Sequence, residues 1–104
     1  MASKIVWTEN ALNDLEGITR FISQDSVHYA RLTLQRITDA TEMLVEFPES
    51  GRIVPEAEPS PCHEIICSPY RIIYQIVTGD VYIVTVLHGA RRFASDELPK
   101  LDQR

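Results

Sequence analysis

The chain has 104 residues, a formal net charge of −5, 44% hydrophobic residues and 24% charged residues. These values indicate a single globular domain, residues 1–104, with one modest core. They argue against a protein whose whole surface binds nucleic acid. The apolar runs are too short to span a membrane and no secretory signal is visible, so we expect a cytoplasmic protein.

The first half of the chain predicts a short strand followed by two helices. Residues 4–8 favour a strand, and Thr8 is a suitable N-cap for a helix whose apolar positions recur at helical spacing as far as Ile22. Asp25 or Ser26 can cap a second helix that reaches Phe47 and includes Leu34 in its apolar stripe. The short break between them predicts an antiparallel helical hairpin.

The second half predicts strands. Residues 52–61 are polar and rich in proline and indicate a loop, and the β-prone runs that follow cover residues 63–67, 70–77 and 81–88. Gly79 and Asp80 close a hairpin between the last two runs, and Ser95 is placed to start a short C-terminal helix. The expected fold is α+β: a small antiparallel sheet packed against the N-terminal helical hairpin, in the order β-α-α-β-β-β.

Strand alternation assigns side chains to the two faces of this sheet. On the middle strand, Ile72, Tyr74 and Ile76 share one face, which we expect to pack against the helices. Arg71 and Gln75 share the other face, which we expect to be open, half polar and functional.

The two cysteines, Cys62 and Cys67, are five residues apart and could lie on one extended strand. That spacing separates them by roughly 16 Å and places them on opposite faces, whereas a disulfide requires Cα atoms within about 7 Å. We expect free thiols.

Positive charge is concentrated near the end of the chain. Arg71, Arg91 and Arg92 share the segment 70–92 with one acidic residue, Asp80, while most acidic residues lie earlier in the sequence. The sheet is therefore expected to carry a local basic patch on an acidic protein.

Several short motifs, in order along almost the whole chain, together resemble the RelE/ParE superfamily of toxins from bacterial type II toxin–antitoxin systems. They are Trp7-Thr8 with Ala11 and Asp14-Leu15, Phe47-Pro48 with Gly51-Arg52, the run Tyr70 to Tyr74, and His88-Gly89 with Arg91-Arg92. The resemblance implies growth arrest by the toxin and neutralisation by an antitoxin encoded beside it.

The family contains two activities. RelE-like members cut messenger RNA on the ribosome and need a base, an acid and cations around the phosphate, whereas ParE-like members poison DNA gyrase by protein contact. Arg71 and Arg91 match the two arginines that contact phosphate in the nuclease branch. The lysines of that branch are missing from residues 62–67, and its final Tyr or His-Tyr is missing from residues 93–104. The chain therefore resembles the ParE branch more closely.

Each candidate residue also has a plainer interpretation. Arg71 could be a solvated strand residue or an ion-pair partner of Glu64, and Arg91 and Arg92 could serve only to hold the acidic antitoxin. If the protein is a nuclease, Arg71 and Arg91 would stabilise the phosphate. His63, Glu64 and His88 would then be the candidates for the general acid and the general base. The spacing of those last three residues matches no zinc pattern, and we expect no metal and no cofactor.

The resemblance therefore implies the toxin of a type II system, with a role in plasmid stabilisation. It is expected to bind DNA gyrase, to form a hetero-oligomer with a ParD-like or RelB-like antitoxin, and to use Arg71, Gln75, Arg91 and Arg92 for target or antitoxin contact. A ribosome-dependent mRNA endonuclease is the alternative. A degenerate toxin that only binds its antitoxin remains a third possibility.

Overall fold

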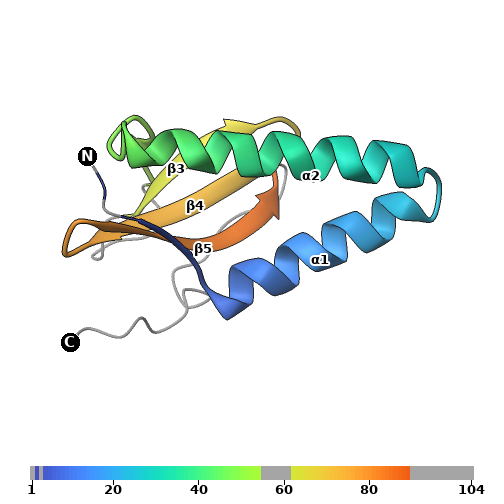
Figure 1. Cartoon of the computed structure of the whole chain (residues 1–104), viewed down its shortest axis with the longest axis horizontal. Coiled ribbons are helices and arrows are strands. Elements are labelled where there is room, and N and C mark those ends of the chain that lie inside the picture. The colour runs from blue at the N-terminus through green and yellow to red at the C-terminus, as the bar shows by residue number, and fades with distance from the viewer. Residues whose placement is uncertain (1, 3, 55–61, 90–104) are drawn as a thin grey trace.

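The computed structural model describes residue 2, residues 4–54 and residues 62–89. Two helices form a hairpin that covers one face of a five-stranded sheet (Figure 1). This is the predicted α+β arrangement. Within the described ranges, neither helix has the length and apolarity that a membrane span requires.

The helices are α1, Glu9–Ser23, and α2, Val27–Glu42, which continues into a 3-10 turn at Met43–Val45. Both predicted N-caps are present, because the side chains of Thr8 and Ser26 accept hydrogen bonds from the first turns of α1 and α2. Thr8 also donates to the carbonyl of Ile83 at 2.8 Å, so the same residue starts the helix and fastens it to the sheet.

The strands are β1 (Ile5–Trp7), β2 (Arg52–Ile53), β3 (His63–Cys67), β4 (Tyr70–Val77) and β5 (Asp80–His88), in the spatial order β1-β5-β4-β3-β2. The three long strands have almost the predicted bounds. Two details differ from expectation. The sheet is mixed rather than antiparallel, because β1 runs parallel to β5, and β2 is an additional strand within the segment predicted as a loop.

The main core lies between the sheet and the helices. Ile72 and Tyr74 of β4 are fully buried there with Ile37 of α2 and Leu44, which confirms the face assigned to the helices. The prediction for Leu34 is wrong: Leu34 is 37% exposed, and Thr33 takes the buried position in that turn of α2. The helical hairpin extends beyond the ends of the strands in Figure 1. The sheet therefore covers less of the helical turns near the tip of the hairpin.

The opposite face of the sheet, here called the distal face, is not simply open. Val54, Cys62, Ile73, Val84 and Leu87 form a second buried cluster on it. The strands therefore carry apolar residues on both faces, and only part of the distal face is available for polar groups. Arg91, Arg92 and the helix expected at Ser95 lie outside the described residues, as does most of the predicted loop.

Both cysteines are free and buried, as expected. Cys62 belongs to the distal cluster and Cys67 to the main core, which confirms that they lie on opposite faces. Burial raises the pKa of the Cys62 thiol, and its hydrogen bond with the Gln75 side chain offsets this only in part. Cys62 is therefore a structural residue of the distal face, and Gln75 is engaged there with it.

Candidate functional site

A buried carboxylate organises the polar end of the distal face. Glu64 of β3 is 1% exposed, and its two oxygens accept hydrogen bonds from two arginines: Oε1 from Nε of Arg71 at 2.6 Å, and Oε2 from Nε of Arg52. We call Arg52, Glu64 and Arg71 the arginine clamp. Its three residues come from β2, β3 and β4, so the clamp joins three neighbouring strands.

Strand register explains why these residues meet. Arg52 lies opposite Glu64 in the antiparallel pairing of β2 with β3, and Arg71 lies opposite Ile66, two residues further along β3. Residues two apart on a strand point to the same face, and directly opposed or diagonal neighbours are within reach of long side chains. The clamp therefore follows from the pairing of the strands.

The backbone that carries Arg52 is held by a tyrosine of the main core. The Tyr74 hydroxyl donates to the carbonyl of Pro48 at 2.7 Å and accepts from the amide of Gly51 at 3.0 Å. A Cβ at Gly51 would lie 2.5 Å from the Glu64 carbonyl oxygen and 2.6 Å from the Tyr74 hydroxyl. Only glycine permits this close approach, which places Arg52 beside Glu64.

The clamp keeps Glu64 ionised. Burial of the Glu64 carboxyl raises its pKa, but the hydrogen bonds and charges of Arg71 and Arg52 outweigh burial, so the net pKa lies below its usual value. An ionised carboxylate whose two oxygens are both engaged by guanidinium groups is a poor proton acceptor. Glu64 therefore acts here as a structural anion, and the ion pair with Arg71 that the sequence allowed is present.

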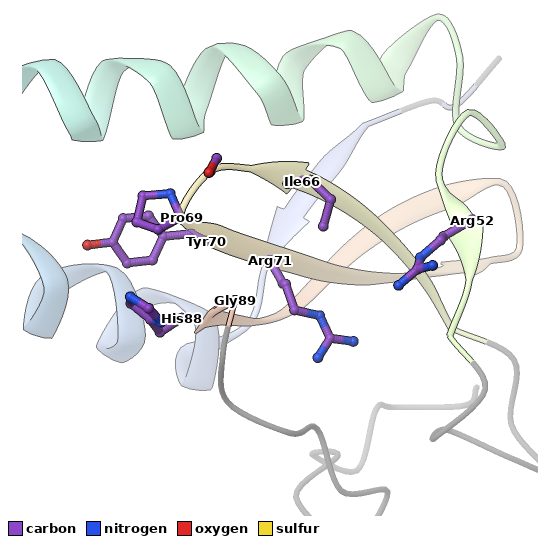
Figure 2. A pocket seen from close by; sticks show the side chains of 8 residues that line it. Arg52, Ile66, Pro69, Tyr70, Arg71, His88 and Gly89 are labelled. Atoms are coloured by element: carbon purple, nitrogen blue, oxygen red, sulfur yellow. The ribbon is translucent and has the colours of Figure 1, made fainter.

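The two arginines of the clamp differ sharply in exposure. The Arg71 side chain is 10% exposed and that of Arg52 is 73% exposed. Both line a hollow of about 440 Å³, together with Ile66, Ser68, Pro69, Tyr70, His88 and Gly89. In Figure 2 the two guanidinium groups point away from α2, on the same side of the sheet.

Strand alternation separates His63 and His88 from Glu64, although His88 also borders the hollow. His88 pairs with Tyr70, the residue next to Arg71 on β4. The His88 ring contacts the Tyr70 ring edge to face at a centroid distance of 5.9 Å. Figure 2 shows the His88 side chain beside Tyr70 and away from the guanidinium groups. His63 stacks on buried Tyr74 at 5.3 Å. The structure thus separates both rings from Glu64 by strand alternation, and it does not bring His63, Glu64 and His88 together.

His88 and Tyr70 also line a second hollow, of about 400 Å³, between α1 and the end of β5. Asp14 of α1 lies in it and accepts hydrogen bonds from the Thr85 hydroxyl and, at 3.1 Å, from the Val86 amide. These bonds fix α1 against β5. Within the described ranges, no three His, Cys, Asp or Glu side chains gather as ligands for a metal ion.

Arg52 was not among the residues that the sequence assigned to the site. Two signals were available: the Gly51-Arg52 pair among the motifs of the resemblance, and Glu64 itself, a charged residue in the apolar run from His63 to Cys67. A buried carboxylate requires cationic partners, and Arg71 supplies only one of them. The second partner came from a strand of two residues, which is too short to recognise from periodicity.

Comparison with known proteins identifies the family. The family model for the ParE toxin of the type II toxin–antitoxin system parDE matches residues 5–93. The chain belongs to the RelE/ParE superfamily of type II toxins. A toxin of this kind has an antitoxin as its partner.

Similar proteins carry names from both branches of the superfamily. Toxin RelE2 of Caulobacter vibrioides is 36% identical over 89 residues, covering 86% of this chain and 98% of that protein. Among solved structures, the chromosomal ParDE TA system from P. aeruginosa has a TM-score of 0.67 at 20% identity, covering 85% of this chain and 96% of that one. A mutant of the E. coli toxin RelE in the free state has a TM-score of 0.60 at 20% identity, with 86% of both chains covered. The two solved structures share the fold.

Proposed function

We propose that this toxin arrests growth by binding and poisoning DNA gyrase in the cytoplasm, and that a ParD-like antitoxin neutralises it. The observation that carries the proposal is the arginine clamp. The carboxylate next to Arg71 is locked between two guanidinium groups, and the rings of His63 and His88 contact Tyr74 and Tyr70 rather than Glu64. The match to the ParE family model supports the same branch.

Ribonuclease chemistry would make different demands on this site. Transfer of the 2′ proton of RNA needs a base within hydrogen-bond distance of the hydroxyl, beside the cations that hold the phosphate. Glu64 is ionised, but Arg52 and Arg71 occupy its oxygens. A contact surface made of arginines and apolar side chains suits protein binding better.

The contact residues proposed for gyrase or antitoxin are Arg71, Gln75, Arg91 and Arg92. Arg71 is anchored by Glu64 at the edge of the hollow and Gln75 is engaged with Cys62, so these two act from fixed positions. We expect Arg91→Ala to reduce toxicity without unfolding the protein. Full toxicity of a soluble Arg91→Ala variant would remove this residue from the surface.

One induction experiment tests the activity. The toxin is expressed from a tightly controlled promoter while synthesis of DNA, RNA and protein is followed in parallel with labelled precursors. Gyrase poisoning predicts DNA double-strand breaks and an SOS response while translation continues. Purified toxin should also cause purified gyrase to accumulate linear DNA from plasmid, and added antitoxin should prevent it.

The second candidate is a ribosome-dependent mRNA endonuclease. Its specific support is that Arg52, Arg71 and His88 all line one hollow. It predicts that protein synthesis stops first and that messages are cut in the ribosomal A site, a result that would replace the gyrase proposal. A toxin that only binds its antitoxin predicts no growth defect and no effect on either target.

A further inference from the structure

Arg52 differs from an ordinary surface arginine. Its side chain is 73% exposed, yet its Nε is hydrogen-bonded to a carboxylate whose own side chain is fully buried. An exposed arginine normally loses much rotamer freedom when it binds a partner, and this loss weakens binding. Here Glu64 restricts the side chain when the protein folds, so less freedom remains to be lost.

The rest of the clamp makes Glu64 a rigid support. Arg71 binds its other oxygen at 2.6 Å from a side chain that is 10% exposed, and the hydrogen bond of Gly51 to Tyr74 fixes the backbone next to Arg52. By contrast, Arg20 on α1 pairs with Glu16 at 2.9 Å, with exposures of 69% and 65%. Arg20 has similar exposure and a carboxylate partner, but no buried support.

The charge of the clamp favours one kind of ligand. Glu64 is one ionised carboxylate shared by two guanidinium groups, so it offsets the positive charge of exposed Arg52 only in part, on a chain whose formal net charge is −5. A protein binds nucleic acid tightly when several of its cations displace counterions from the phosphates at once. One exposed cation contributes little to binding of that kind. A single carboxylate on a ligand side chain matches this positive charge, and arginine binds carboxylates through paired N–H donors.

An apolar contact lies beside the charge. Ile66 is 61% exposed, lines the same hollow as Arg52 and lies on the same face of β3 as Glu64. An exposed large aliphatic side chain next to a fixed cation suits a ligand segment with an acidic residue next to an apolar one.

We propose that Arg52, held in place by the Arg71–Glu64 pair, is a recognition residue for an acidic side chain flanked by an apolar one on a segment of a partner protein. Ile66 forms the apolar part of this contact. Arg52 touches the ligand, and Glu64 is a positioning residue. The inference rests on the proposed function only in taking the partner to be a protein.

The test uses the full-length toxin and defined probes. Short capped peptides of alternating leucine and glutamate are titrated into ¹⁵N-labelled protein, and the Nε–Hε signals of arginine are followed with the backbone amides. The matched probe has glutamine for every glutamate, and a short single-stranded RNA is a third probe. We expect the acidic peptide to shift the signals of Arg52 and Ile66, and the glutamine peptide and the RNA to leave them unchanged.

Substitutions then distinguish specific binding by Arg52 from nonspecific attraction of the acidic peptide to positive charge. Arg52→Ala should weaken binding of the acidic peptide by about tenfold, whereas the control Arg20→Ala should not change it. Glu64→Gln makes the clamp more positive, so charge alone would tighten binding. Positioning by Glu64 predicts weaker binding instead. If Glu64→Gln does not fold, Arg52→Lys decides, because it keeps the charge but loses the Nε–H donor, and we expect it to bind more weakly than the wild type.

Several outcomes would overturn the inference. They are an equal response to the glutamine peptide, equal losses in Arg52→Ala and Arg20→Ala, undiminished binding by Arg52→Lys, or a response at Arg52 to RNA alone. This binding assay does not involve gyrase, so its failure leaves the gyrase proposal standing. Likewise, a toxin that fails to act on gyrase could still recognise the acidic peptide through Arg52.

Discussion

The arginine clamp and the tip of the helical hairpin both present charged and apolar side chains, but they are built in opposite ways. At the clamp, exposed Arg52 is fixed by buried Glu64. At the tip, Phe21 and Val27 are 71% and 57% exposed, and the ion pair of Arg20 with Glu16 is exposed on both sides. The comparison teaches that exposure alone does not identify a binding residue, whereas an exposed group with a buried support is pre-organised to bind.

The largest expected effect is on the buried charge of the clamp. Glu64→Gln removes the buried carboxylate that Arg71 binds from a side chain only 10% exposed, which should lower the free energy of unfolding by about 3–5 kcal/mol. Urea denaturation of the variant and the wild type at neutral pH measures this loss of stability. The control is Glu16→Gln at the hairpin, where loss of an exposed ion pair should cost about 1 kcal/mol or less. Similar losses at the two sites would mean that the clamp is no better built than a surface pair.

Two residues of α2 give the next contrast. Ile37 is fully buried in the main core and Leu34 is 37% exposed. Ile37→Ala should cost about 2–5 kcal/mol through the cavity that it leaves, and Leu34→Ala should cost about 1 kcal/mol or less. Thermal unfolding of both variants under one set of conditions is sufficient. A larger loss for Leu34→Ala would place the boundary of the core closer to the tip than the structure does.

Leu34 also shows why helical periodicity predicted the elements better than their exact faces. The spacing from Ala30 to Leu44 identified α2, but steps of three and four residues both fit a helix. Which of Thr33 or Leu34 turns inward depends on where the sheet lies under the helix. The position of the sheet is a feature of the tertiary structure, and hydrophobicity alone favoured Leu34 over Thr33.

The candidate site was predictable to a similar extent. Alternation along β4 placed Arg71 on the face away from the helices, and its pairing with Glu64 was among the alternatives. The clamp as a whole was not predictable, because β2 has two residues and its register with β3 depends on the close approach of Gly51. The second apolar cluster was missed for a related reason: Ile73 alternates with Ile72, so one strand contributes to two cores.

Acid should weaken the protein through the clamp. The folded-state pKa of Glu64 is lowered, so its contribution to stability is present above the pKa of an unfolded glutamate, about 4.3. The contribution is lost as the pH falls from there through the folded-state value. The stability difference between the wild type and Glu64→Gln should therefore shrink as the pH is lowered below about 4. Urea titrations at stepped pH test this, and a constant difference would show that Glu64 does not carry the linkage.

The smallest expected effect on stability is the most informative for binding. Arg52→Ala removes the exposed partner of Glu64 and leaves Arg71 in place, so the free energy of unfolding should fall by only about 1 kcal/mol or less. Measured in the same urea series, this value separates two roles for one guanidinium group. A small loss of stability with a large loss of peptide binding assigns Arg52 to recognition. A loss as large as that of Glu64→Gln would make Arg52 a structural cation, and any fall in affinity would then follow from the disturbed clamp.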